Sequence, residues 1–202
     1  NCSLGISVEA TRAALQIAKK VIAWINPNMP RTHGDALVSL KRFDRYFEEA
    51  APIPLHQQPP QNPITQKIGE RVAGLIDDGD CLQMGIGAIP DATLACLHHH
   101  KDLGIHTEMF SDGVLPLVEQ GVINNSRKRK HPGRIVTTFA MGSQKLYDFV
   151  DDNQEVFFLD VEYTNDTSVI RQNKQVMSIN SALQVALSGQ VCADSIGTKI
   201  YS

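Results

Sequence analysis

The chain has 202 residues, of which 42% are hydrophobic and 20% charged, and its formal net charge is −3. This composition predicts a folded protein with a sizeable apolar core and argues against a disordered chain or a coiled coil. No apolar run approaches the roughly 20 residues that span a bilayer, and the first residues lack a signal-peptide pattern, so we expect a cytoplasmic protein without membrane partners.

The first part of the chain predicts a helix followed by a linker. Ser7 can cap a helix whose apolar residues recur at helical spacing as far as Ile22, and this helix would end before Asn26 and Pro27. Residues 51–63 contain five prolines and three glutamines, a composition that resists both helix and central strand. We therefore expect residues 51–63 to link two parts of the protein.

A second helix is predicted directly after this linker. Asn62 can cap it, Pro63 suits its first position, and Gly79 would stop it. We expect its buried stripe to consist of the apolar residues at helical spacing, namely Ile64, Ile68, Val72, Leu75 and Ile76.

Beyond Gly79, strand-like and helix-like segments alternate. Such alternation is typical of parallel βαβ units and predicts an α/β fold with an open, mainly parallel sheet flanked by helices. The segments are a strand over Cys81–Met84, a helix opened by Pro90 and Asp91, a strand over Ile105–Phe110, a short helix from Leu115, a strand near Ile135, a helix near Gln144 and a strand near Phe157.

Near the end of the chain the pattern changes to that of a hairpin. Val176–Ile179 and Leu183–Leu187 are strand-like, and the second leads through Ser188 and Gly189 into Gln190–Cys192. Because a Ser-Gly pair between strand-like segments favours a tight turn, we expect an antiparallel margin to the sheet here.

A glycine-containing turn and a carboxylate follow neighbouring predicted strands. The turn covers residues 85–89, and Glu108 lies near the carboxyl end of the strand predicted over Ile105–Phe110. Open α/β sheets bind ligands beyond the carboxyl ends of their strands. Glycines allow close approach of a ligand, and free N–H groups at the following helix start favour anions. The pattern indicates a ligand site, with a solvated carboxylate and an ordinary strand-to-helix turn as the alternative interpretation.

A series of motifs covers these segments and others: 26–34, 84–90, 107–113, 131–133, 141–143, 146–149, 163–166, 178–181 and 189–192. In these motifs, and along essentially its whole length, the sequence resembles the family I coenzyme A transferases. It is most similar to the branch of 4-hydroxybutyrate and butyrate CoA-transferases and acetyl-CoA hydrolases. The resemblance implies a CoA-transferase (NagB-like) lobe. Residues 1–50 would end the N-terminal lobe, residues 51–63 would link the lobes, and residues 64–202 would begin the C-terminal lobe.

The resemblance implies that Glu108 is the catalytic nucleophile. Its carboxylate would attack an acyl-CoA and then carry CoA as a glutamyl-CoA thioester, until a carboxylate acceptor takes the CoA in ping-pong fashion. Neither a metal nor a permanently bound cofactor is expected. Asn165 is implied to orient this carboxylate, although an Asx turn would equally explain an Asn-Asp pair. Contact with CoA or its acyl-thioester region is implied for the turn, which consists of Gly85, Ile86, Gly87, Ala88 and Ile89.

We therefore expect an acyl-CoA:carboxylate CoA-transferase that pairs acetyl-CoA with 4-hydroxybutyrate, butyrate or a similar short acid, and that forms a homodimer. An acetyl-CoA hydrolase with the same covalent chemistry is one alternative. A non-catalytic module that binds CoA or a sugar phosphate is another, because fold does not imply activity. The chain starts without methionine and stops within an extended pattern, so we expect a longer parent. The resemblance implies that a glycine-rich CoA-binding segment follows Ser202.

The remaining chemistry-bearing residues are interpreted as structural. Residues 98–100 are three histidines, but neighbours on a helix point in different directions, and no acidic or cysteine partner lies at metal-ligand spacing. The basic run 127–131 is short and lacks aromatic residues, which indicates a solvated loop, or one that steers anionic CoA, and not a nucleic-acid site. Arg31 and His33 could line a cleft or serve structure alone. Neither disulfides nor a zinc site is predicted for the widely spaced Cys2, Cys81, Cys96 and Cys192.

Overall fold

The computed structural model describes residues 1–56 and 62–200, and it confirms the expected α/β class. Its centre consists of two three-stranded parallel sheets with the strand orders β12-β6-β7 and β3-β11-β9. An isolated parallel bridge between His106 and Val136 connects β7 to β9, so that six strands run side by side. These strands are β3 (His33–Gly34), β6 (Cys81–Met84), β7 (Gly104–Ile105), β9 (Ile135–Thr137), β11 (Val156–Phe158) and β12 (Val176–Ile179).

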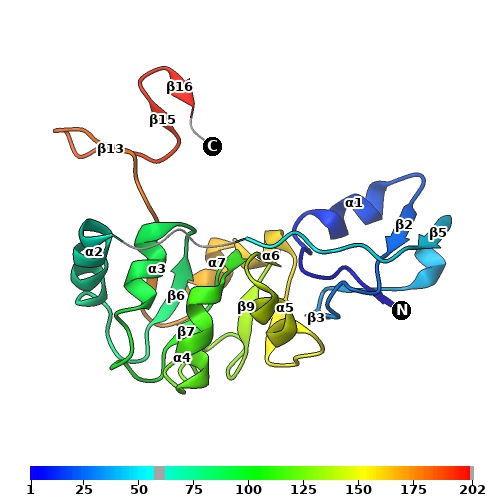
Figure 1. Cartoon of the computed structure of the whole chain (residues 1–202), viewed down its shortest axis with the longest axis horizontal. Helices are drawn as coiled ribbons and strands as arrows, with labels where there is room; N and C mark the ends of the chain where they lie inside the picture. The colour runs from blue at the N-terminus through cyan, green and yellow to red at the C-terminus, as the bar shows by residue number, and fades with distance from the viewer. Residues whose placement is uncertain (57–61, 201–202) are drawn as a thin grey trace.

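Helices flank the strands: α3 lies beside β6, α2 packs on α3, and α5 lies beside β9 (Figure 1). The predicted segments near Cys81, Leu115, Ile135, Gln144 and Phe157 are confirmed as β6, α4, β9, α5 and β11. No helix in the described part of the chain is long and apolar enough to cross a membrane. The helices are α1 (Thr11–Ile17), α2 (Pro63–Ala73), α3 (Ala88–Leu94), α4 (Leu115–Glu119), α5 (Gln144–Val150), α6 (Val161–Thr164) and α7 (Thr167–Ile170), with 3-10 turns η1 (Leu40–Arg42) and η2 (Asp112–Val114).

The apolar core lies between the six strands and these helices. It draws on β6, β7 and β11 and on the inward faces of α3, α4 and α5. Burial of these side chains is the main favourable contribution to folding, at about 25 cal/mol per Å² of apolar surface. The largest fully buried side chains include Leu82, Leu94, Ile105, Phe110, Leu117, Leu146, Tyr147 and Phe158.

The first helix is shorter than the sequence predicts. It covers only Thr11–Ile17, no side chain of Ser7 caps it, and residues 22–25 form the strand β2 (Ile22–Ile25). β2 pairs in parallel with β5 (Arg45–Glu48). The prediction was wrong because the apolar spacing continued past Lys20 into Val21-Ile22-Ala23-Trp24-Ile25, whose branched and aromatic residues favour a strand.

The second helix begins as predicted but buries only part of the expected stripe. Asn62 caps it through a capping box with Thr65, and Pro63 occupies its first turn. Its end is Ala73, before Gly74 and not at Gly79. The expected stripe is confirmed for Ile76, which is 5% exposed, and for Val72, which packs against the core. It is wrong for Ile64, Ile68 and Leu75, which are 72%, 36% and 70% exposed. The small residues Gly69 and Ala73 are buried instead.

Two boundaries near the candidate site also differ from prediction. The strand expected over Ile105–Phe110 is divided into β7 and β8 (Met109–Phe110), with a bend at Glu108. The strand β8 pairs in parallel with β10 (Phe139–Ala140) and not with a strand of the central sheets. The helix α3 begins at Ala88, two residues before Pro90, because Gly87 adopts φ +108° and ends the turn there.

The hairpin near the end of the chain is confirmed, but it does not extend the sheet. Its strands β13 (Gln184–Val185) and β14 (Val191–Cys192) pair antiparallel with each other, and β15 (Ser195–Ile196) and β16 (Lys199–Ile200) form a second hairpin. Both lie away from the six strands in Figure 1. The strand at this margin is β12, which is parallel to β6.

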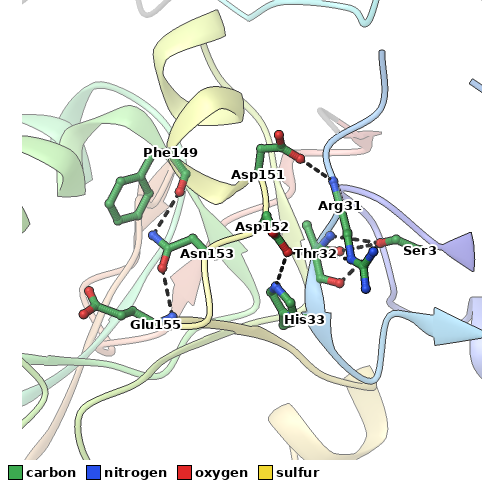
Figure 2. Close-up of polar contacts among 9 residues, drawn as sticks. All are labelled: Ser3, Arg31, Thr32, His33, Phe149, Asp151, Asp152, Asn153 and Glu155. Carbon is green, nitrogen blue, oxygen red and sulfur yellow. Dashed lines mark hydrogen bonds and ion pairs between the residues drawn. The ribbon is translucent and has the colours of Figure 1, made fainter. Parts of the chain in front are cut away.

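Residues 1–38 are attached to the rest of the chain by strand pairing and by a polar cluster. The strand β1 (Cys2–Ser3) pairs with β4 (Leu37–Val38) within this segment, and β3 pairs with β11 outside it. Figure 2 shows the polar contacts beside β3, where the main-chain N–H of Arg31 donates to Asp151 and His33 lies 3.0 Å from the carboxylate of Asp152.

These contacts decide how Arg31 and His33 are interpreted. Asp151 and Asp152 belong to the loop that leads from α5 into the amino end of β11, whereas Glu108 follows the carboxyl end of β7. Arg31 and His33 therefore hold the N-terminal segment in place. The expected linker, residues 51–63, is only partly covered, since residues 57–61 lie outside the described residues. Its described start contacts α5, where the Tyr147 hydroxyl donates to the Pro54 carbonyl.

We expect Gly69→Ala to destabilise the protein, although alanine favours helices over glycine. A Cβ at Gly69 would lie 2.6 Å from the main-chain carbon of Ala92 in α3, so the two helices would have to separate. The free energy of unfolding in urea should fall by about 1–3 kcal/mol, as for other overpacked sites.

Gly74, the residue that caps the end of the same helix, provides the control. It has an ordinary helical φ of −67°, and a Cβ there would come no closer than 3.5 Å to its neighbours. Gly74→Ala should leave stability unchanged or slightly raised. Equal effects of the two substitutions would contradict the close contact of α2 with α3.

Candidate active site

Glu108 combines a fixed main chain with a side chain that is open to solvent. Its carbonyl oxygen accepts hydrogen bonds from the main-chain N–H groups of Thr138 and Phe139, at 2.9 and 3.1 Å. The hydroxyls of Thr137 and Thr138 donate to the same oxygen, at 2.9 and 3.0 Å. The residue is nevertheless exposed. The bend thus directs a carboxylate outward from the carboxyl edge of the sheet.

Thr107 connects this bend to the glycine turn. Its hydroxyl accepts a hydrogen bond from the Met84 N–H at 3.0 Å and donates to the Met84 carbonyl at 3.1 Å. Both residues are buried. Because Thr107 precedes Glu108 and Met84 precedes Gly85, this contact places the start of the turn beside the carboxylate-bearing bend.

Asn165 lies against Glu108, as the family resemblance led us to expect. Its side-chain amide donates to the Oε2 atom of Glu108 at 2.9 Å across 57 residues of sequence. Asn165 directly follows the last residue of α6, and α6 follows β11. The Asx turn considered as an alternative is formed by the next residue, since the Asp166 carboxylate accepts from the Ser168 N–H at 2.6 Å. The Asn165 amide therefore binds Glu108, and it is Asp166 that forms the Asx turn.

The two glycines of the turn meet different constraints. Gly87 needs its φ of +108°, and a Cβ there would contact nothing within 4 Å, so the space above it is open. At Gly85 a Cβ would lie 2.6 Å from the side-chain oxygen of Asn180, so this glycine permits close packing on residues after β12 and not on a ligand. Ile86, between them, is 56% exposed. The outer part of the turn is thus the surface that a ligand could contact.

Acidic residues lie near the start of α3, the helix that follows this turn. Asp91 lies in the first turn of α3, and burial, together with the negative charge of Asp112, raises the pKa of its carboxyl to about 6, while His56 acts in the opposite direction. Asp112 is held by Ser143, whose N–H donates to it at 2.8 Å. These carboxylates disfavour the binding of a phosphate at this helix end, which the sequence had suggested.

The basic run 127–131 is not simply a solvated loop. Lys128 is 5% exposed, and its ammonium donates to the carbonyls of Ile105 and Arg134 at 2.6 and 2.7 Å. Burial lowers the pKa of Lys128 to about 8. The ammonium therefore joins β7 to the residue before β9. His131 is also engaged, at 2.9 Å from the Tyr163 hydroxyl.

The histidines of residues 98–100 make structural contacts, as expected. His98 lies 2.8 Å from the side-chain oxygen of Gln120, and His100 lies 3.0 Å from the Ile76 carbonyl. They sit in the turns that follow α3 and not on the helix itself. In the described ranges 1–56 and 62–200, no group of three or more His, Cys, Asp or Glu residues could hold a metal ion.

Sequence reasoning missed the buried polar residues that support the site. They are His106 and Thr107 before Glu108, and Thr137 and Thr138 at the end of β9. The available signal was the presence of polar residues in otherwise apolar strand segments, because a buried polar side chain must find a hydrogen-bond partner.

Comparison with known proteins identifies relatives that agree with one another in family. Residues 142–202 match the family described as acetyl-CoA hydrolase/transferase C-terminal domain. The chain is 52% identical over its full length to 4-hydroxybutyrate coenzyme A transferase of Clostridium kluyveri, of which it covers 47%. It is 46% identical to succinyl-CoA:acetate/propanoyl-CoA:succinate CoA transferase of Fasciola hepatica, covering 100% of this chain and 42% of that protein. The chain thus spans less than half the length of these relatives.

Solved structures agree with these relatives. The crystal structure of 4-hydroxybutyrate CoA-transferase from Porphyromonas gingivalis superposes with a TM-score of 0.90 and 43% identity, over 94% of this chain and 48% of that one. RipA from Yersinia pestis gives a TM-score of 0.92 with 36% identity, over 96% of this chain and 44% of that one. The six-stranded arrangement is therefore shared with known CoA-transferase structures.

Replacing Thr107 with valine should destabilise the protein, because the change keeps the shape but leaves the Met84 N–H and carbonyl without the hydroxyl. An unpaired buried polar group costs about 1–3 kcal/mol, and we expect a loss of that size in urea denaturation. Thr107→Ser keeps the hydroxyl and should retain most of the stability. If the valine and serine variants were equally stable, the hydroxyl contact would have no energetic role.

Asp91→Asn should flatten the pH dependence of stability. Since the pKa of Asp91 is raised from 3.8 to about 6, the folded state binds more protons than the unfolded state between these values. Stability from this group is therefore present below about pH 4 and is lost as the pH rises through 6. Between pH 4.5 and 7 we expect the unaltered protein to lose about 1 kcal/mol more than the variant, after allowance for solvent screening.

The control for this titration is Asp148→Asn, which removes the same formal charge from an exposed position. A flatter slope of the unfolding free energy against pH in both variants would assign the effect to the lost charge and not to the position of Asp91. Identical slopes for the Asp91 variant and the unaltered protein would contradict the assigned burial effect.

Proposed function

Because this chain belongs to the acetyl-CoA hydrolase/transferase family, we propose that it carries the catalytic carboxylate of an acyl-CoA:carboxylate CoA-transferase. The observation that carries the proposal is the hydrogen bond from Asn165 to Glu108 at the open carboxyl edge of the sheet. Its relatives are named as CoA-transferases at up to 52% identity. Because the chain spans less than half the length of these relatives, the activity is proposed for the whole protein and not for this chain alone.

Glu108 would act as the nucleophile in two exchanges. Its carboxylate oxygen attacks the thioester carbon of the acyl-CoA, the C–S bond breaks, and CoA thiolate leaves behind an acyl-glutamyl anhydride. The thiolate then attacks the glutamyl carbon and expels the acyl group as a carboxylate, which gives the glutamyl-CoA thioester. An acceptor carboxylate reverses both exchanges and leaves with CoA. Each bond broken is replaced by one formed, and no net proton or electron is required.

A neutral amide suits both states of this nucleophile. The Asn165 N–H can donate to the charged carboxylate in the free enzyme and to the carbonyl oxygen of the thioester afterwards. A lysine or arginine at this position would stabilise the carboxylate more strongly than its uncharged products and so would weaken its attack. Asn165 therefore orients Glu108 without holding it in one charge state.

The outer part of the glycine turn would contact the acyl-thioester end of CoA. The open space at Gly87 and the exposed side chain of Ile86 lie on the turn that Thr107 places beside Glu108. Acidic Asp91 and Asp112 near the start of α3 argue against the CoA phosphates at the same place. The turn from Gly85 to Ile89 is therefore proposed to position the reacting group.

The substrates are proposed to be acetyl-CoA and a short carboxylate such as 4-hydroxybutyrate or butyrate. CoA would be a substrate and not a permanently bound cofactor. The homodimer and the cytoplasmic location expected from the sequence stay predictions.

The test is intact-protein mass spectrometry of the full-length parent after incubation with acetyl-CoA. We expect a CoA-sized adduct on the Glu108 peptide that borohydride reduces and that Glu108→Gln abolishes, since the amide is a far weaker nucleophile. Glu162→Gln, at an exposed acid on α6, provides the control and should form the adduct normally.

The fate of the adduct separates the remaining alternatives. Discharge that depends on an added carboxylate supports the transferase, whereas equally fast discharge in water alone indicates an acetyl-CoA hydrolase. Binding of acetyl-CoA without any adduct would reject the role of Glu108 and leave a non-catalytic binding module.

A further inference from the structure

We propose that His106 is a positioning residue for this reaction, because its ring N–H fixes the Thr164 carbonyl and thereby holds Asn165 against Glu108. The inference rests on the proposed function, since it concerns the geometry of the same carboxylate. It assigns a role to a buried histidine whose side-chain hydrogen bond in the described part of the chain goes to Thr164.

The contacts of His106 and Glu108 form a pair of adjacent bridges. Nε2 of His106 lies 2.8 Å from the carbonyl oxygen of Thr164, and two residues further along, Glu108 accepts the amide of Asn165 at 2.9 Å. Thr164 and Asn165 are consecutive. The two bridges therefore close a small ring between residues 106–108 and residues 164–165, which restricts how the amide can move relative to the carboxylate.

Both ends of the first bridge are rigid. His106 is 3% exposed, and its main-chain N–H donates to the Leu82 carbonyl at 3.0 Å within the central strands. Thr164 is 1% exposed and is the last residue of α6. A carbonyl at the carboxyl end of a helix has no N–H partner from the following turn, so it depends on a donor from elsewhere. His106 supplies that donor.

The histidine is held in one protonation state. A carbonyl can only accept, so the proton resides on Nε2, and Nδ1 is buried without a hydrogen-bond partner in the described part of the chain. Burial lowers the pKa of His106 against the effect of the Thr164 hydrogen bond, and the positive charges of Lys128 and His131 lower it further. The ring therefore stays neutral and keeps its single directed N–H at physiological pH.

Packing alone does not account for this side chain. An apolar residue of similar volume would fill the position without leaving a buried ring nitrogen unpaired, which is costly. The chain offers a comparison in His100, whose Nε2 also lies at a main-chain carbonyl and whose Nδ1 is also buried and unpaired among the described residues. That residue contacts Ile76, before β6, and so lies at the opposite end of the strands from Glu108.

The test compares His106→Asn with His106→Gln in the full-length protein, by rapid quenching of adduct formation with acetyl-CoA. The glutamine amide reaches the position of Nε2, whereas the asparagine amide reaches only that of Nδ1. We expect the asparagine variant to slow adduct formation about 10- to 100-fold with little change in the KM for acetyl-CoA. The glutamine variant should stay within about 3-fold of the unaltered protein, because it restores the donor.

A double-mutant cycle asks whether His106 acts through Asn165. In an Asn165→Ala background, adding His106→Asn should slow the reaction by less than about 2-fold further, because the amide to be positioned is already absent. His100→Asn should lower stability but leave the rate of adduct formation unchanged. Effects of His106→Asn that multiply with those of Asn165→Ala would overturn the inference.

The remaining outcomes are also decisive. Equal losses in the asparagine and glutamine variants would reject the directed N–H as the cause. Should His106→Asn fail to fold, the glutamine variant carries the test, and a loss of more than about 10-fold in that variant would reject the inference. Absence of any adduct in the unaltered protein would instead reject the proposed function. The tautomer can then be checked separately by ¹⁵N NMR of His106, where a proton on Nδ1 would contradict the bridge.

Discussion

The hydrogen bonding between the Thr107 hydroxyl and the main chain of Met84 is the contact on which the candidate site depends. Regular pairing of β6 with β7 covers only two residue pairs and ends at Leu82 and Ile105. A hydroxyl can accept and donate at once, so Thr107 continues the connection with its side chain. Its main chain is thereby free to pair with β9, and the chain can bend at Glu108 while staying bound on both sides.

Local signals in the sequence predicted the parts of the fold that short segments determine. The strand over Cys81–Met84 and the capped start of α2 at Asn62 were recovered because a buried apolar run and an Asn-Pro pair act within a few residues. The contact of Asn165 with Glu108 was also found, although only the resemblance to known enzymes pointed to it. Apolar periodicity failed for α1 and for the exposed Ile64, since it does not reveal which face meets another element.

What the sequence did not reveal concerns contacts between distant residues. Nothing local indicates that Lys128, within a run of five basic residues, is buried with its ammonium on two carbonyls. No local pattern distinguishes Gly69 within the predicted helix, whereas its missing side chain sets the distance between α2 and α3. Likewise, the role of His106 depends on its contact with the end of α6, which no local pattern predicts. Such roles depend on partners that strand order brings together.

The pairing of β3 with β11 has a consequence for the order in which the protein can form during synthesis. Arg31 meets Asp151 across 120 residues, and β3 finds its neighbour only when Phe158 has been made. Closing so long a loop is entropically costly and slow relative to local pairing. During synthesis, the N-terminal segment therefore stays without its partner strand β11 until that strand has been made. The Val8 N–H also donates to the Thr138 carbonyl, and the Thr138 N–H donates to the Glu108 carbonyl, so the bend at Glu108 also gains this support late.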